Sequence, residues 1–163
     1  LEEIGLILND HNSNKISSSE IRENLKAGKI ELANKYLKRN FSVGGKVIKG
    51  DQRGRTIGIP TANLEYPLNT ITIPYGVYAV ESIIEGNTYF GIVNFGIRPT
   101  FNKDKPIVEA YLFDFDNDIY DKDIEILFHK QIRQEKKFND IKELLNQINI
   151  DIAEAKKILK YGN

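Results

Sequence analysis

Six short segments in the middle of the chain restrict its fold more than any other feature of the sequence. Most are rich in the strand formers Val, Ile, Tyr and Phe, and they span residues 41–49, 61–65, 77–84, 88–95, 107–113 and 124–128. The connections carry Gly, Pro, Asn and Asp, and no long helices alternate with the segments. Because a parallel sheet needs such helices, we predict a mainly β domain whose six antiparallel strands form a small barrel.

The residues before this β region indicate a short helical segment. Serines at positions 17–19 precede apolar residues at helical spacing, which is typical of a helix N-cap, although a serine-rich helix start can also bind phosphate. Gly28 ends that helix, and a second short helix follows. The periodicity changes after Asn40, so we predict two units, residues 1–39 and residues 40–163.

Two apolar stripes at helical spacing follow the strands and predict two C-terminal helices. The first stripe begins at Phe138 and ends at Ile148, and the second begins at Ile152 and ends at Leu159. Such stripes usually face the core of a domain, so we expect both helices to lie against the barrel.

The balance of charge argues against a nucleic-acid-binding protein. The 163 residues include 23 Lys and Arg and 23 Asp and Glu, so the formal net charge is zero and any anion site must be local. The absence of cysteine excludes disulfides, thiol catalysis and cysteine-bound metals. The sequence has no apolar run long enough for a membrane helix and no signal-peptide pattern, so we expect a cytoplasmic protein without a membrane partner.

The stretch from Gly50 to Leu64 is the first candidate for chemistry. It contains glycines, which let a backbone approach a ligand closely, and arginines, whose N–H groups suit phosphate. Thr61 and Asn63 lie two positions apart, so on a strand their oxygen-bearing side chains share one face. This pattern indicates either a nucleotide–Mg²⁺ site or an ordinary basic hairpin turn.

Three other stretches also have two readings. Glu109 stands in an apolar strand, where it is either a general base facing a cleft or part of an exposed strand face. The acidic run at residues 114–123 lacks the Gly and the Glu of an EF-hand, which favours a solvated loop. Residues 132–138 are basic and end in Phe138, so they either begin a helix or cover a flat ring ligand near phosphate.

Several common catalytic motifs are absent from the sequence. It contains no Walker-type P-loop, no Gly-x-Gly-x-x-Gly and no His-Glu-x-x-His pattern. With only His11 and His129, a Ser-His-Asp triad has little support.

Five motifs in order resemble those of the riboflavin kinase family over roughly residues 40–160. They are Gly50…Gly54-Arg55…Gly58-Ile59-Pro60-Thr61-Ala62-Asn63, Tyr75-Gly76-Val77-Tyr78, Asn94-Phe95-Gly96-Ile97-Arg98-Pro99-Thr100-Phe101, Val108-Glu109-Ala110-Tyr111-Leu112-Phe113-Asp114-Phe115 and Ile132-Arg133…Glu135-Lys136…Phe138. The resemblance implies a six-stranded antiparallel Greek-key barrel with C-terminal helices and a short N-terminal helical segment. It also implies transfer of the γ-phosphate of ATP to riboflavin, with Mg²⁺, to give FMN and ADP.

Carried over residue by residue, the resemblance gives roles to particular side chains. Glu109 would be the base that takes the proton of the ribityl 5′-hydroxyl. Thr61 and Asn63 would meet Mg²⁺ and the nucleotide phosphates. The other nucleotide-side residues would be Gly50, Gly54, Arg55, Asp114 and Tyr120, and the flavin-side residues would be Arg133, Lys136 and Phe138.

The segment Ile16-Ser17-Ser18-Ser19-Glu20-Ile21-Arg22 resembles a second motif. In bacterial bifunctional riboflavin kinase/FMN adenylyltransferases, Ile-Ser-Ser-Thr-x-Ile-Arg closes the adenylyltransferase domain just ahead of the kinase, and Ser19 replaces its Thr here. The resemblance implies that residues 1–39 are the tail of such a domain, natively fused to the kinase. The His-x-Gly-His site of that domain is absent from this sequence, so FAD synthesis is not expected of this chain.

Two other functions remain as alternatives at this point. One is a non-catalytic barrel that binds a flavin or a nucleotide. The other is an OB-like nucleic-acid module, which the neutral net charge disfavours.

Overall fold

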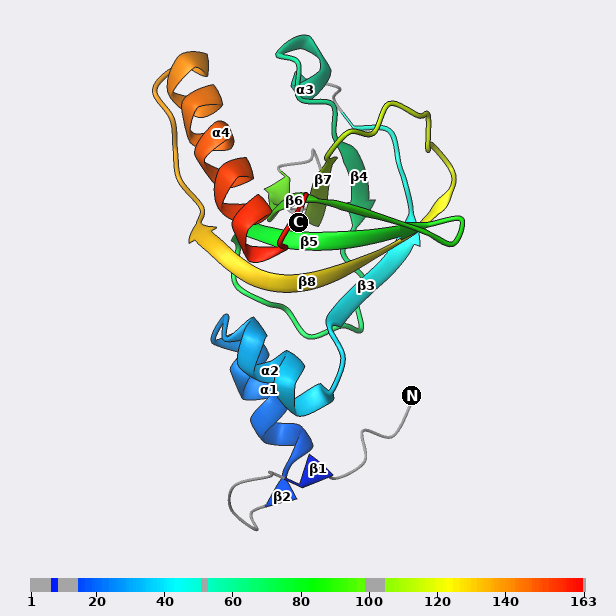
Figure 1. Ribbon diagram of the computed structural model, residues 1–163, viewed down its shortest axis with the longest axis vertical. Coiled ribbons are helices and arrows are strands. Elements are labelled where there is room, and N and C mark those ends of the chain that lie inside the picture. The colour runs from blue at the N-terminus through cyan, green and yellow to red at the C-terminus, as the bar shows by residue number, and fades with distance from the viewer. Residues whose placement is uncertain (1–6, 9–14, 51–52, 99–104, 163) are drawn as a thin grey trace.

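The computed structural model describes residues 7–8, 15–50, 53–98 and 105–162, and most of them belong to one curved sheet and four helices (Figure 1). The sheet is antiparallel, with the strand order β3-β8-β5-β6-β7-β4. Its strands are β3 (Phe41–Lys46), β4 (Ala62–Glu65), β5 (Gly76–Ile84), β6 (Asn87–Arg98), β7 (Lys105–Leu112) and β8 (Asp123–Gln134).

The connections between these strands form a Greek key. Strands β5, β6 and β7 follow one another as neighbours, and β8 returns to lie beside β5. Ile48, just after β3, bridges to Asn63 of β4, and the Ile48 N–H donates to the Asn63 carbonyl oxygen at 2.8 Å. The two edges of the sheet thus approach each other, and the predicted six-stranded antiparallel fold is confirmed as a half-barrel.

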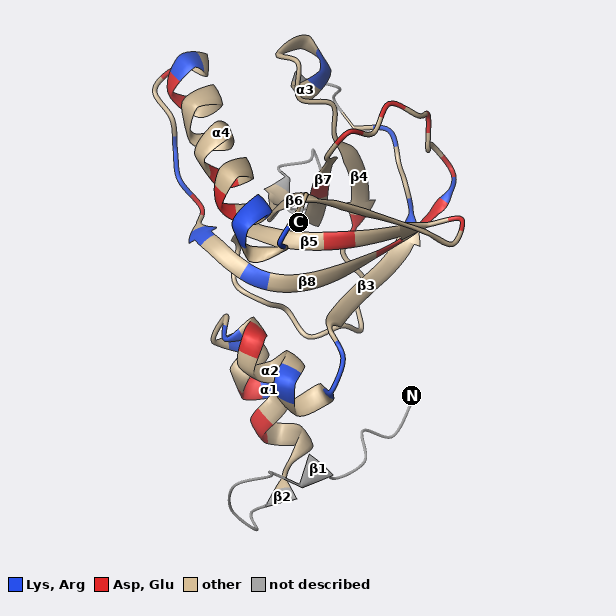
Figure 2. Cartoon of the chain, viewed as in Figure 1, with Lys and Arg blue, Asp and Glu red and all other residues tan. Residues whose placement is uncertain are grey.

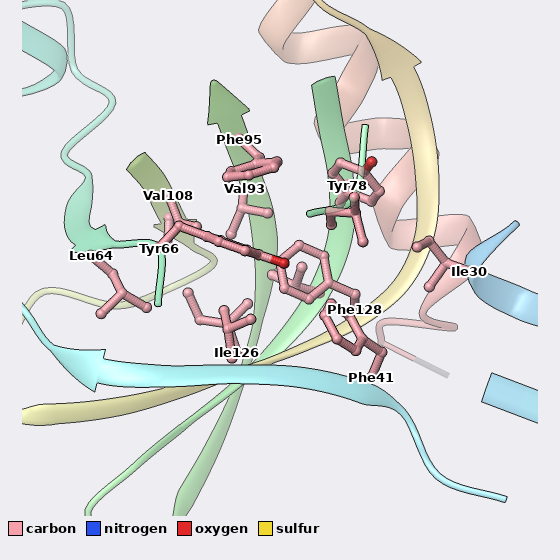
Figure 3. Close-up of a cluster of buried hydrophobic side chains, with 14 of the residues drawn as sticks. Ile30, Phe41, Leu64, Tyr66, Tyr78, Val93, Phe95, Val108, Ile126 and Phe128 are labelled. Atoms are coloured by element: carbon pink, nitrogen blue, oxygen red, sulfur yellow. The ribbon is translucent and has the colours of Figure 1, made fainter. Parts of the chain in front are cut away.

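Large aromatic side chains fill the inside of the half-barrel (Figure 3). Tyr78, Phe95 and Phe128 are fully buried. The ring of Phe95 lies 4.5 Å from that of Tyr66, and the ring of Phe128 lies 5.3 Å from that of Tyr78, measured between centroids. Burial raises the pKa of the Tyr66 and Tyr78 hydroxyls, which therefore stay neutral inside this core.

Helix α4 (Ile141–Ile158) covers the outer face of the sheet (Figure 1). Asp140 caps its start by accepting a hydrogen bond from the Glu143 N–H at 2.7 Å. Ala155 and other apolar residues of the helix contact Val77 and Ala79 of β5. Strand β5 is therefore covered on both faces, which explains its nearly continuous apolar sequence.

Two predictions about the C-terminal region were wrong. The two predicted helices are one helix, because neither Gly nor Pro interrupts the chain between Ile148 and Ile152. Ile132 and Arg133 do not begin a helix, because β8 continues through them and pairs Arg133 with Val77 of β5.

Two helices precede the barrel, α1 (Ser18–Lys26) and α2 (Ile30–Leu37), after a small pair of strands, β1 (Ile7–Leu8) and β2 (Lys15–Ile16). The Ser17 side chain accepts a hydrogen bond from the Glu20 N–H, which confirms the predicted N-cap. On α2, Asn34 donates to the Phe128 carbonyl and accepts from the Phe41 N–H, both at 2.7 Å. The helices are thereby fixed to β8 and β3.

Acidic and basic positions are interspersed along the chain, and neither kind is confined to one element (Figure 2). None of the helices that the structure describes is long and apolar enough to cross a membrane.

Candidate functional site

Helix α3 (Arg53–Thr56) and the first turns of α4 stand at the same end of the sheet (Figure 1). An open cleft of about 950 Å³ lies between them, on the face of the sheet that α4 covers. The short helix α3 was not predicted from the sequence. Gly54 and the loop after α3 form one wall, and Leu144 and Ile148 of α4 form the other. The floor comes from strands β4 to β8.

Five strands contribute one residue each to a row across this floor. The register pairs Arg133 of β8 with Val77 of β5, Val77 with Asn94 of β6, Asn94 with Glu109 of β7, and Glu109 with Asn63 of β4. Paired residues of neighbouring strands point to the same face, and all five line the cleft. Because neighbouring strands lie about 4.8 Å apart, the row spans about 19 Å.

Asn63 stands at the β4 end of the row and carries an unused oxygen. Its side chain is 4% exposed, and its Oδ1 has no hydrogen-bond partner among the residues that the structure describes. An added Cβ at Gly50 would lie 2.3 Å from the Asn63 amide nitrogen, so glycine at this position leaves room for the amide. A buried oxygen without a partner costs about 1–3 kcal/mol, which points to a ligand at this end of the cleft.

Thr61 also lines this end of the cleft. A hydroxyl and an amide oxygen are neutral hard ligands, which fit a Mg²⁺ ion that keeps phosphate oxygens and waters as its other ligands. Within the described ranges, no group of three His, Cys, Asp or Glu side chains could hold a metal ion. The hydroxyl of Thr61 and the amide oxygen of Asn63 are donors that fit a metal arriving with phosphates.

Glu109 lies in the middle of the row and is half-buried. In the described part of the chain its carboxylate has no ion-pair or hydrogen-bond partner, and neither does that of Glu135, which is exposed above Gly96. Asp151, the third carboxylate of the cleft, is 1% exposed and paired. Two carboxylates in the cleft are thus available to accept a proton.

The β8 end of the row is held by an ion pair whose carboxylate is buried and whose guanidinium is partly exposed. Arg133 Nε lies 3.0 and 2.9 Å from the two carboxylate oxygens of Asp151, and its Nη2 lies 2.9 Å from Oδ2. Gln147 donates to the same carboxylate at 3.0 Å. The guanidinium also lies 5.6 Å from the ring centre of Phe138, with the Lys136 ammonium at 5.4 Å. Arg133 therefore ties the sheet to α4 and supports the aromatic ring.

Seven of the eleven predicted site residues line the cleft, namely Gly54, Thr61, Asn63, Glu109, Arg133, Lys136 and Phe138. Gly50 lies against Asn63 without lining the cleft.

Three predicted residues lie outside the lining of the cleft. Arg55 is exposed on α3. Asp114 follows β7 and accepts a hydrogen bond from the Tyr161 hydroxyl, which raises the pKa of that tyrosine. The ring of Tyr120 faces the Lys49 ammonium, 5.8 Å from the ring centre. The structure does not bring these three side chains to the others.

Five polar residues of the cleft had no predicted role: Asn94, Tyr111, Glu135, Lys137 and Asp151. The position of Asn94 could have been predicted from the sequence, because a two-residue turn at Glu85-Gly86 fixes the register of the hairpin and places Asn94 opposite Val77. Asp151 carries no such signal, because its partner lies on another element.

Comparisons with known proteins agree on one family. The family model for riboflavin kinase (Flavokinase) matches residues 37–159. The bifunctional riboflavin kinase/FMN adenylyltransferase of Bacillus subtilis is 48% identical over 144 residues, which cover 86% of this chain and 46% of that protein. The protein of the same name from Escherichia coli is 38% identical over 145 residues, covering 88% and 46%.

A solved structure shares the fold. The crystal structure of a macrolide-efflux protein from Streptococcus pneumoniae matches with a TM-score of 0.83 at 32% identity, over 93% of this chain and 49% of that one. The chain spans about half the length of the curated relatives that it matches.

Proposed function

This chain belongs to the riboflavin kinase family, and from that premise we propose that its cleft transfers the γ-phosphate of ATP to the ribityl 5′-hydroxyl of riboflavin. The observation that carries this assignment is the row across the floor, in which Asn63 stands at one end beside Glu109 and Arg133 stands at the other end. The phosphates of ATP would then bind near Asn63 and the flavin near Arg133. Glu109, the base, would lie between them, where the hydroxyl meets the γ-phosphate.

Asn63 and Thr61 would hold the Mg²⁺ that accompanies ATP. The unpartnered, buried Oδ1 of Asn63 supports this role. When bound there, the ion would supply the charge neutralisation on which phosphoryl transfer depends. Gly54 folds the neighbouring wall tightly, since an added Cβ would lie 2.1 Å from the Ile59 carbonyl oxygen.

Glu109 would accept the proton of the attacking hydroxyl. Its carboxylate stands next to Asn63 in the row and is free of competing partners among the described residues. A base must reach the proton that it takes, and this position lies between the phosphate end and the flavin end. The flat flavin ring would lie toward α4, where Val77, Ile148 and Phe138 line the cleft.

The direct test of this function is product formation. The chain is mixed with riboflavin, ATP and Mg²⁺, and FMN is separated by chromatography. FMN that appears in step with ADP supports the kinase. Binding of both substrates without FMN would favour the non-catalytic barrel instead.

We further propose that residues 1–39 are the tail of an adenylyltransferase domain and that the whole protein also converts FMN to FAD. The relatives support this, because they carry both activities in their names and are about twice as long as the matched region. The full-length protein should then form FAD from riboflavin and ATP, whereas this chain should stop at FMN.

Replacing Asn63 by Leu should separate stability from nucleotide binding. Loss of one ligand interaction of about 1.5–3 kcal/mol should weaken Mg²⁺–ATP binding roughly 10- to 100-fold. The free energy of unfolding should change by less than about 1 kcal/mol, because a side chain with an unsatisfied oxygen is replaced by an apolar one of similar size. Calorimetry and thermal unfolding measure the two effects. Asn117→Leu, in an exposed loop, is the control, and an unchanged Mg²⁺–ATP affinity in Asn63→Leu would contradict the assignment.

A further inference from the structure

Asn94 is the member of the cleft row that the proposed mechanism leaves without a role. It lies between Glu109 on β7 and Val77 on β5, and it lines the cleft. Its side chain is exposed, and its amide makes no hydrogen bond within the described residues. A polar group that is neither buried nor paired contributes little to the fold, and its place on the cleft floor beside Glu109 leaves the amide free to bind a ligand there.

The order of residues in the row indicates which part of a substrate would lie beside Asn94. The nucleotide side is at Asn63, and the apolar wall and Phe138 are near Arg133. A hydroxyl that reacts at Glu109 belongs to a chain that must continue from Glu109 toward Val77. Asn94 is one strand farther along, about 4.8 Å away. An extended five-carbon chain is about as long, so its middle hydroxyls would lie between the two residues, within reach of the Asn94 amide.

The chemistry of the side chain matches such a chain. An amide has both N–H donors and a carbonyl acceptor, and neighbouring hydroxyls of a sugar alcohol also donate and accept. A carboxylate or an ammonium at this place would offer one of the two functions. Sites that hydrogen-bond a substrate hydroxyl discriminate strongly against analogues that lack it.

We propose that Asn94 hydrogen-bonds the middle hydroxyls of the ribityl chain and is a specificity-determining residue for the polyol part of the flavin. This inference rests on the proposed function, because it takes Glu109 as the position of the reacting hydroxyl. It concerns binding, so it can be measured without turnover.

The test compares four flavins in wild type, Asn94→Ala and Asn87→Ala, using the change in flavin fluorescence on binding. The flavins are riboflavin, its 3′- and 4′-deoxy analogues, and lumiflavin, which has the ring without the ribityl chain. Wild type should prefer riboflavin to at least one deoxy analogue by about 10- to 100-fold. Asn94→Ala should reduce this preference to less than about threefold. Its affinity for lumiflavin should stay that of wild type, and Asn87→Ala, at the distant start of β6, should match wild type throughout.

The outcomes separate this inference from the proposed function. A preference that persists in Asn94→Ala overturns the role of Asn94, even if FMN is formed. A preference that collapses in this variant supports the role, even if wild type forms no FMN, in which case the proposed function fails alone. Asn94→Ser, which keeps a shorter donor and acceptor, should retain part of the preference, and a complete retention in both variants would again overturn the inference.

Discussion

Glu109→Gln is expected to lower kcat for FMN formation by about 10²- to 10⁴-fold, which is the usual contribution of a general base. The amide keeps the size of the side chain but cannot take up the proton of the ribityl hydroxyl. The affinities for riboflavin and Mg²⁺–ATP should change by less than about threefold, because no contact of the fold depends on this carboxylate in the described residues. Steady-state kinetics and fluorescence titration measure the two effects.

Glu135→Gln is the matched control for this prediction. Glu135 is the other carboxylate of the cleft without a partner among the described residues, and it lies beside Gly96, two residues along β6 from Asn94. It should keep kcat within about threefold of wild type if Glu109 is the base. A large loss of kcat in Glu135→Gln, together with a near-normal kcat in Glu109→Gln, would show that Glu135 and not Glu109 is the base.

The second large effect is on stability, and it concerns Arg133. Arg133→Met leaves the carboxylate of Asp151, 1% exposed, with Gln147 as its remaining donor. Breaking a buried ion pair on one side costs about 3–5 kcal/mol. The free energy of unfolding in urea should fall by that amount, and Tm should fall by roughly 10 °C.

A double variant decides what Arg133 does for the flavin. In Arg133→Met/Asp151→Leu no charge is left buried, so most of the lost stability should return. If Arg133 contacts the flavin, as the family resemblance implies, this stable variant still binds riboflavin more weakly than wild type. If it binds riboflavin normally, Arg133 acts by holding α4 against the sheet. Stability that does not return would contradict the ion pair as the cause.

The sheet could be predicted from the sequence because its information is local. Strand formers, the turn at Glu85-Gly86 and the change of periodicity after Asn40 fix the number and direction of the strands. The site was predicted in part for the same reason, because Thr61, which directly precedes β4, and Asn63 of β4 lie two residues apart and share a motif. The motif order of the family resemblance then added Glu109.

What the sequence could not predict depends on contacts between distant elements. Helix α4 is continuous through Asp151, which lies between the two apolar stripes. A carboxylate can be buried at this position because Arg133 of β8 forms an ion pair with it. Residues 132–134 belong to β8 because β5 offers a partner strand, although their basic sequence is also typical of a helix start. The unpartnered state of the Asn63 oxygen likewise follows from three-dimensional packing against the segment that contains Gly50.

The attachment of α2 to the barrel sets a limit on how this domain can be exchanged between proteins. Ile30 and Ala33 belong to the same buried cluster as the barrel aromatics, and Asn34 hydrogen-bonds both β3 and β8. The region that matches the family model begins later, at residue 37. A gene fusion or excision made at that boundary would leave part of the hydrophobic core behind. The unit that folds together is therefore longer than the region that matches the family model. A barrel of this family that is fused to a new upstream domain should keep α1 and α2 in order to keep its core intact.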